Sequence, residues 1–246
     1  MYGELRVVDD VPGAFAAMAI EAFAASSEDH EFGMALSGGS TARPCYERLA
    51  EDGARAVDWW RVDIYWGDER CLPPTDPESN ERLVREALLE RVGAAHAVYP
   101  MRCDEGPDAY QLRVGEVGKF DLTHLGLGPD AHTASLFPGS PALDADPGRL
   151  VVMNRDPTGR NPYERMTLTF SGIARSRLVV FTVSGESKRE AMQAHQSQIA
   201  DDDFFLQMPI EMFSVAFGTE WFIASGHTRP PGAPFGGDLF ADVTPS

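Results

Sequence analysis

The sequence has few cysteines, a shortage of basic residues and no long hydrophobic run, and each shortage excludes a class of protein. The 246 residues include three cysteines and no CxxC pair, so neither a disulfide framework nor a zinc knuckle is predicted, and reduced thiols are expected. The 21 Lys and Arg residues against 38 Asp and Glu give a net charge of −17, which disfavours nucleic acids and anionic membranes as partners. No stretch approaches the roughly 20 apolar residues that span a bilayer, and the first ten residues do not resemble a signal peptide. We therefore expect a cytoplasmic protein.

Short apolar runs alternate with helix-like segments along the chain. Strands are expected at 32–36, 62–66, 120–127, 150–153, 166–170, 178–183, 213–217 and 221–223, and helices at 15–25, 44–51, 81–91 and 188–199. This alternation, without internal repeats or a clear linker, predicts an α/β fold with a mainly parallel sheet. We expect a single domain over residues 1–246.

Three of the expected strands end in polar clusters, and functional loops of α/β folds gather beyond the carboxyl ends of strands. The clusters are SGGST at 37–41, WGDER at 66–70 and GLGPDAHTASLFPGS at 126–140. The first combines two glycines with two hydroxyls before an expected helix, which is suitable chemistry for a phosphate. It is not a Walker A loop, and a glycine turn with a Ser or Thr helix cap is the structural alternative.

His132 lies in the third cluster, close to Asp130, and a histidine there can act as a base near neutral pH. The alternatives are a histidine bonded to its own loop and a metal site with Asp130 and His124, whose spacing matches no zinc pattern. Residues 126–131 also match G-x-G-x-x-A, but Pro138 and the following glycine interrupt the helix that a dinucleotide site needs. Since no G-x-S-x-G elbow is present, hydrolysis would use activated water.

Taken together and in order, SGGST, WGDER(C)xPPxDPxSNxRL and GLGxDxHTASLFPG resemble the motifs of 6-phosphogluconolactonases, from the first expected helix to Lys188. The resemblance implies a Rossmann-like, three-layer α/β fold with helices on both faces, related to glucosamine-6-phosphate deaminases. It implies hydrolysis of 6-phospho-D-glucono-1,5-lactone in the oxidative pentose phosphate pathway, with no metal or other cofactor. The expected partner is this small sugar-phosphate lactone, and the chain is expected to be a monomer or homodimer.

The resemblance also implies roles for individual residues. The substrate phosphate would be held by Gly38, Gly39, Ser40, Thr41, Arg165 and Lys188. His132 would be the general base, an effect typically worth ~10²–10⁴-fold in rate. Asp68 and Glu69 would flank the sugar ring or orient His132 and the water, while Arg70 would help to neutralise the oxyanion. The structural alternatives are that Asp68 caps a turn and that Arg70 pairs with Glu69 or another neighbour. In so acidic a protein, the basic residues must converge locally to bind an anionic substrate.

The sequence departs from the family's pattern at two places, and two other functions are alternatives to the lactonase. Ala131 replaces the glycine that usually precedes the histidine, at a cost of about 1 kcal/mol if φ is positive there. Residues 221–224 lack an aspartate that often follows. A sugar-phosphate isomerase or deaminase would abstract a proton through a carboxylate such as Asp68, but the HTASLFPG segment favours the lactonase. A sugar-phosphate sensor is disfavoured by the acidic charge and by the lack of a helix-turn-helix extension.

Overall fold

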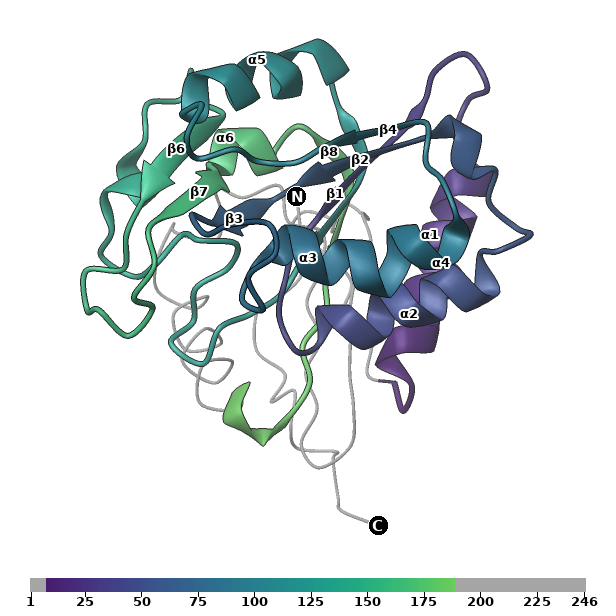
Figure 1. Cartoon of the computed structure of the whole chain (residues 1–246), viewed down its shortest axis with the longest axis horizontal. Coiled ribbons are helices and arrows are strands. Elements are labelled where there is room, and N and C mark those ends of the chain that lie inside the picture. Colours follow the sequence, from purple (N-terminus) through teal and green to yellow (C-terminus); the bar gives the residue numbers. More distant parts are fainter. Residues whose placement is uncertain (1–7, 189–246) are drawn as a thin grey trace, which may run out of the picture.

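The computed structural model describes residues 8–188 and contains a five-stranded parallel sheet (Figure 1). The strands are β1 (Phe32–Leu36), β2 (Val62–Trp66), β4 (Ala97–Tyr99), β5 (Phe120–Leu125) and β8 (Ser176–Phe181). Their order is β4-β2-β1-β5-β8, so the direction of winding reverses between β1 and β5. Ligands of doubly wound folds bind beyond the carboxyl ends of the strands at such a reversal.

Helices cover both faces of this sheet, as the sequence predicts. The helices are α1 (Val11–Ala24), α2 (Ala42–Asp52), α3 (Asn80–Val84), α4 (Glu90–Val92) and α5 (Pro107–Val117). Helices α1 to α4 gather on one side and α5 lies on the other (Figure 1). The hydroxyl of Tyr110 in α5 donates to the carbonyl of Trp66 and accepts from its N–H, which fixes α5 against β2. The expected three-layer α/β arrangement is confirmed.

A second sheet is antiparallel, and it is joined to the first through one residue. It consists of β3 (Asp68–Arg70), β6 (Val151–Asn154) and β7 (Arg165–Leu168) in the order β3-β7-β6. The N–H of Gly67 donates to the carbonyl of Leu36 at 2.7 Å, and the carbonyl of Gly67 accepts from the N–H of Leu168 at 2.8 Å. The chain therefore continues from β2 into β3, and the two sheets share this stretch of backbone.

Several expected elements differ from the structure at their ends or in type. The expected strand 166–170 ends at Leu168, because the hydroxyl of Thr169 accepts from the N–H of Gly172 and caps α6 (Phe170–Ile173). The expected helix 81–91 begins at Asn80 and contains a π-helical segment, η2 (Arg85–Leu89). Short 3-10 segments occur at η1 (Trp59–Arg61), η3 (Pro141–Asp144) and η4 (Glu186–Lys188). The strands expected at 213–217 and 221–223, and the helix beyond Lys188, lie outside the described residues. Between residues 8 and 188, no helix has both the length and the apolarity needed to cross a membrane.

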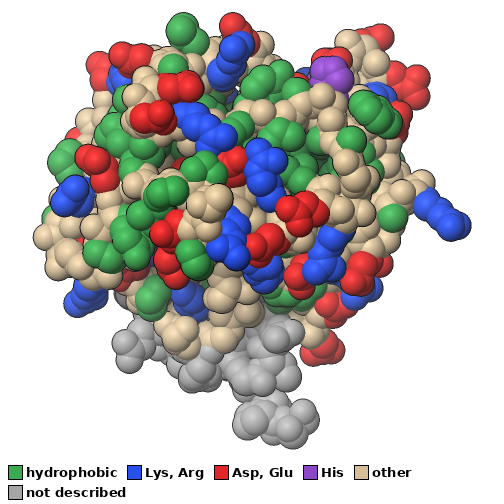
Figure 2. Space-filling view, in the orientation of Figure 1, with side chains coloured by type: hydrophobic (Ala, Val, Ile, Leu, Met, Phe, Trp, Pro, Cys, Tyr) green, Lys and Arg blue, Asp and Glu red, His purple; other side chains and the backbone are tan. Residues whose placement is uncertain are grey.

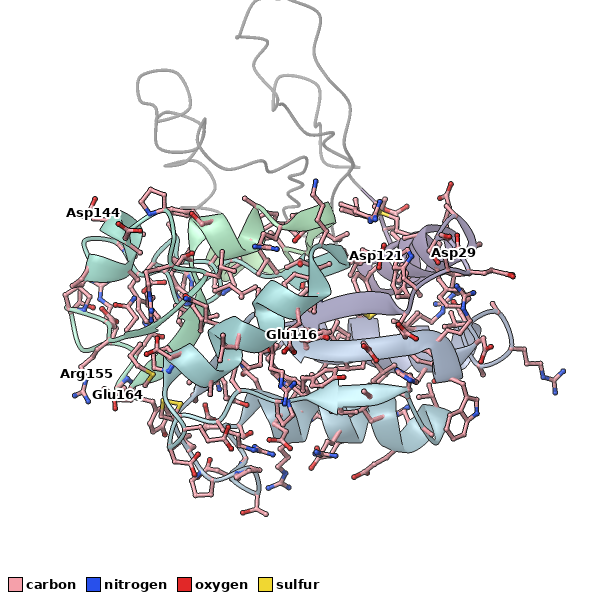
Figure 3. All side chains as sticks on the ribbon, turned by 90° about the horizontal axis from the view of Figure 1, so that it is seen from above. Asp29, Glu116, Asp121, Asp144, Arg155 and Glu164 are labelled. Atoms are coloured by element: carbon pink, nitrogen blue, oxygen red, sulfur yellow. A yellow bond between two sulfur atoms is a disulfide. The ribbon has the colours of Figure 1, made fainter. Side chains whose placement is uncertain are left out.

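The expectation of three reduced thiols is wrong. Cys71 and Cys103 form a disulfide, with Cα atoms 5.5 Å apart, while Cys45 is buried in α2. Figure 3 shows the bond beside Glu164, whose carbonyl accepts from the N–H of Cys71 at 2.9 Å. The two cysteines lie 32 residues apart in the sequence, with Cys71 directly after β3 and Cys103 in the segment after β4. Only the fold brings them together, so their spacing gave no sign of the pair.

Candidate active site

The three polar clusters of the sequence meet around one pocket of about 240 Å³. It lies beyond the carboxyl ends of β1 and β5, at the reversal of the parallel sheet, and the antiparallel sheet supplies a second wall. The predicted site residues that line it are Gly38, Gly39, Ser40, Thr41, Asp68, Arg70, His132, Arg165 and Lys188. Of the residues that the sequence analysis discussed for this site, Glu69 does not line the pocket.

The loop after β1 turns sharply and leads into α2. Gly39 has φ +108°, a conformation that residues with a Cβ atom rarely adopt. A Cβ atom on Gly38 would lie 1.9 Å from Oδ1 of Asn80, so only glycine fits against that side chain. Thr41 is the N-cap residue of α2, and its hydroxyl contacts the Ser184 hydroxyl at 3.4 Å instead of capping the helix. Backbone N–H groups at a helix N-terminus of this kind attract an anion.

A buried hydrogen-bond network supports this loop from below. The hydroxyl of Tyr46 lies 2.9 Å from the N–H and 2.8 Å from the carbonyl of Ser37, the first residue of the loop. The same hydroxyl contacts Nδ1 of His124, whose Nε2 contacts the Thr182 hydroxyl at 2.7 Å. Burial lowers the pKa of His124 to about 3, so its ring is neutral at pH 7. Both of its nitrogens are engaged within the core, so it does not join His132 in a metal site.

His132 is held by the carboxylate of Asp130. Its Nδ1 lies 2.5 Å from Oδ1 of Asp130, and the pKa of Asp130 is lowered to about 2, chiefly by this hydrogen bond. With Nδ1 engaged, Nε2 is the ring nitrogen left for proton transfer, which is the arrangement of a carboxylate-oriented general base. The orientation that the sequence analysis assigned to Asp68 and Glu69 is thus supplied by Asp130.

The backbone around His132 is unusual on both sides. Ala131 has φ +72° and Ala134 has φ +48°, and both are in the left-handed region that favours glycine. The concern raised by Ala131 in the sequence is therefore confirmed, since alanine occupies a position that needs a positive φ. Gly128 does not open a dinucleotide-binding helix. Residues 126–131 form an irregular loop with a turn at 129–130, and a Cβ atom on Gly128 would lie 2.2 Å from Nδ1 of His132.

Asp68, Glu69 and Arg70 are consecutive residues of β3, and the alternation of a strand separates their functions. Asp68 and Arg70 line the pocket, whereas Glu69 points away from it and its carboxylate accepts from the N–H groups of Asn80 and Glu81 at the start of α3. Burial raises the pKa of Glu69 to about 7, although the hydrogen bonds from these N–H groups act to lower it. Glu69 is therefore a helix-capping residue, and the period of two was the signal that separates it from its neighbours.

Asp68 is 4% exposed and is bound by side chains from three segments. Its Oδ2 accepts from the Ser135 hydroxyl at 2.7 Å, its Oδ1 accepts from Nδ2 of Asn80 at 3.2 Å, and NH1 of Arg165 lies 3.9 Å away. These contacts hold the segment after His132 against β3. Asp68 thus fixes the shape of the pocket, in addition to lining it.

Three basic side chains reach the pocket. Arg165 is 4% exposed, lies over the Phe137 ring at 5.7 Å, and its Nε has no hydrogen-bond partner among the described residues. Burial lowers the pKa of Arg165, although the negative charge of Asp68 acts to raise it. Burial likewise lowers the pKa of Lys188, although the charge of Asp130 acts to raise it. Arg70 pairs with Glu78 through NH1, so the predicted alternative that it pairs with a neighbour holds, although it also lines the pocket.

Some residues of the pocket, and the role of Asp130, were not predicted from the sequence. Asn80 and Asn161 line the pocket, and Asp130 orients the histidine. Asn80 belongs to the SNxRL part of the second motif and follows Ser79, the N-cap of α3, so its position after a helix-capping residue was a usable signal. Nothing in the sequence around Asn161 connects it to a residue 31 positions earlier. Within residues 8–188, no group of three His, Cys, Asp or Glu side chains is arranged to hold a metal ion.

Comparison with known proteins shows the family to which the chain belongs. The family model described as glucosamine-6-phosphate isomerases/6-phosphogluconolactonase matches residues 8–221. A 6-phosphogluconolactonase of Synechocystis sp. is 40% identical over 173 residues, which cover 65% of this chain and 69% of that protein. One from Haemophilus influenzae is 30% identical and covers 83% of this chain and 89% of its own. The crystal structure of a 6-phosphogluconolactonase from Shewanella baltica has a TM-score of 0.64 and 29% identity, over 82% of this chain and 88% of that one. The chain is a member of the glucosamine-6-phosphate isomerase/6-phosphogluconolactonase family.

Proposed function

We propose that this protein hydrolyses 6-phospho-D-glucono-1,5-lactone to 6-phosphogluconate, a step of the oxidative pentose phosphate pathway. The observation that carries the proposal is one pocket that is lined by a carboxylate-oriented histidine, the loop at 38–41 and a buried arginine. The names of its relatives, at 30–40% identity, favour the lactonase over the isomerases of the same family.

The phosphate of the substrate would bind at the N-terminus of α2 and against the basic residues. The loop at 38–41 provides backbone N–H groups and two hydroxyls, and Arg165 provides a guanidinium whose Nε has no partner within the described part of the chain. Arginine suits bidentate contact with phosphate, and Lys188 adds a point charge. A buried cation of this kind is stabilised by an anionic ligand, because burial has removed it from water.

The chemistry then follows from His132. Its Nε2 takes a proton from water as the water oxygen attacks the lactone carbonyl carbon, and Asp130 stabilises the imidazolium that forms. Arg70, which lines the pocket, would stabilise the charge on the carbonyl oxygen. When the bond from the carbonyl carbon to the ring oxygen breaks, His132 returns the proton to that ring oxygen. Water is the nucleophile and the protein supplies the base, so this sequence of steps uses no metal or organic cofactor.

A coupled assay tests the proposal. The lactone should disappear well above its rate of spontaneous hydrolysis, and glucosamine 6-phosphate should release no ammonia. Ammonia release would instead identify a deaminase, with Asp68 as the candidate proton acceptor. Saturable binding of 6-phosphogluconate without turnover of either substrate would identify a sugar-phosphate sensor.

The proposal also includes how and where the enzyme works. We place the enzyme in the cytoplasm, as a single domain that acts as a monomer or homodimer. On the face shown in Figure 2, basic and acidic side chains are interspersed, without the broad basic region that binds a nucleic acid backbone. Sedimentation at several protein concentrations would decide between monomer and homodimer.

A further inference from the structure

The carboxylate that holds His132 is itself held by an asparagine. While Oδ1 of Asp130 contacts His132, its Oδ2 accepts a hydrogen bond from Nδ2 of Asn161 at 3.2 Å. Asn161 lies in the connection between β6 and β7 and lines the same pocket. The contact therefore joins the antiparallel sheet to the loop that follows β5, directly behind the proposed base.

Asn161 is in turn fixed by Asp156, at the start of the same connection. Oδ2 of Asp156 accepts from both the backbone N–H and Nδ2 of Asn161, each at 2.9 Å. Its Oδ1 accepts from the N–H and the hydroxyl of Thr158, each at 2.8 Å. Burial works against ionisation of Asp156, but these hydrogen bonds outweigh it and lower its pKa. The Asn161 amide thus has one hydrogen for each of two carboxylates.

An amide is well suited to this position. It donates to Asp130 without neutralising it, so the carboxylate keeps its charge for the imidazolium of His132. An arginine or lysine here would compete with His132 for Asp130, and a carboxylate would repel both neighbouring aspartates.

The loop needs such a contact because its backbone is strained. Ala131 and Ala134 hold positive φ values on either side of His132, and strained backbone persists only where surrounding contacts determine it. After the histidine, the hydroxyl of Thr133 donates to the Gly126 carbonyl at 2.9 Å. Before the histidine, the side chain of Asp130 is held by Asn161.

We propose that Asn161 is a positioning residue, which fixes the Asp130 carboxylate and thereby the ring of His132. It acts on proton transfer more than on substrate binding. The inference rests on the proposed function, in which His132 is the general base.

Two substitutions and one control test this role by kinetics. Asn161→Ala should lower kcat about tenfold while KM changes less, because small errors in the position of a base are costly in rate. Asn161→Asp keeps the shape but replaces the N–H donor with a third carboxylate, so its kcat should fall further. The control Thr158→Val removes one hydrogen bond to Asp156 and leaves the contact from Asn161 to Asp130 in place, so its kcat should stay close to wild type.

A second measurement reads the ring directly and does not depend on activity. In ¹⁵N-edited NMR spectra, the proton shared by His132 and Asp130 should give a downfield signal in the wild type and in Thr158→Val. The signal should shift or disappear in Asn161→Ala. If the wild type does not hydrolyse the lactone, the proposed function fails, and this signal alone decides whether Asn161 orients the ring.

Three outcomes would overturn the inference. Wild-type kcat and an unchanged imidazole signal in both Asn161 variants would show that Asp130 does not need the amide. A raised KM with unchanged kcat would show that Asn161 contacts the substrate instead. A loss of kcat in Thr158→Val equal to that in Asn161→Ala would show that the effect comes from the stability of the connection between β6 and β7.

Discussion

The parallel sheet presents its functional groups on loops, whereas the antiparallel sheet presents them from the strands themselves. The loop at 38–41, which is proposed to bind phosphate, and the His132 loop follow β1 and β5, and both contain residues with positive φ. By contrast, Asp68 and Arg165 belong to β3 and β7 and are each 4% exposed. Loops allow backbone N–H groups and a base to face the substrate, while strands hold charges rigidly where water is excluded. Substitutions in the loops of the parallel sheet and in the strands of the antiparallel sheet should therefore have different effects on the enzyme.

The largest expected effect is on catalysis, and it comes from a substitution in a loop of the parallel sheet. His132→Ala should lower kcat by ~10²–10⁴-fold, because the proposed general base is lost, while 6-phosphogluconate should still bind at the loop proposed to hold the phosphate. Initial rates and calorimetric titration measure the two quantities. His96→Ala is a matched control, since His96 also pairs with an aspartate, Asp63, but at the surface and outside the pocket. Weakened binding with unchanged kcat would show that His132 binds the substrate instead.

The next largest effect is expected on the stability of the protein, when the disulfide between the segments after β3 and β4 is broken. The disulfide joins the residue after β3 to the segment after β4, and it closes a loop between cysteines 32 residues apart. Its reduction should lower the free energy of unfolding by about 3–4 kcal/mol, measured by denaturant titration with and without a thiol reductant. The double variant Cys71→Ser, Cys103→Ser should not respond to the reductant. Equal stability of the wild type in both conditions would contradict the prediction.

A smaller effect is expected on substrate binding, from a substitution in a strand of the antiparallel sheet. Arg165→Met should raise KM by roughly 10–100-fold, because hydrogen bonds to a charged group contribute ~1.5–3 kcal/mol. The variant should also unfold at a lower temperature than the wild type, because Asp68 is left as a buried carboxylate without its neighbouring cation. Arg113→Met, on the surface of α5, should change neither quantity. A fall in kcat at constant KM would place Arg165 at the reacting atoms.

The smallest effect concerns strain in the His132 loop. Ala131→Gly should raise the free energy of unfolding by about 0.5–1 kcal/mol, because glycine adopts φ +72° without a steric penalty. Ala109→Gly, within helix α5, should lower it by a similar amount. Thermal denaturation compares the two. A loss of stability in Ala131→Gly would show that the methyl group contributes more by packing than its backbone conformation costs.

The same comparison explains which parts of the structure could be predicted from sequence. Strands β1, β2 and β5 are short buried apolar runs that end at or close to glycine, so both the strands and the polar loops behind them were recognisable. In the antiparallel sheet, β6 and β7 coincide with expected strands, but β3 was not expected, because it pairs with β7, a segment far away in the sequence. Strand β3 has three charged residues, and their roles become clear only when β7 and α3 are placed beside them.

Contacts between distant residues were likewise hidden within the site. The resemblance of the motifs predicted roles for His132, Arg165 and the loop at 38–41, but it could not show that Asp130 bridges His132 and Asn161. The disulfide was missed for the same reason. Local pattern identifies the residue types that a site needs, whereas the partners of each side chain depend on the tertiary fold.

Gly67, where the two sheets share a backbone, bears on how the enzyme selects its substrate. Since Leu36, Gly67 and Leu168 are hydrogen-bonded in one row, these shared backbone bonds oppose a hinge-like separation of the loop at 38–41 from the strand that carries Arg165. The spacing between the anion-binding groups and the base is therefore set when the chain folds. Such pre-organisation lowers the entropic cost of binding and penalises a ligand whose phosphate and carbonyl carbon are a different distance apart. The enzyme would then discriminate by molecular length, rejecting shorter or longer phosphorylated lactones instead of closing around them.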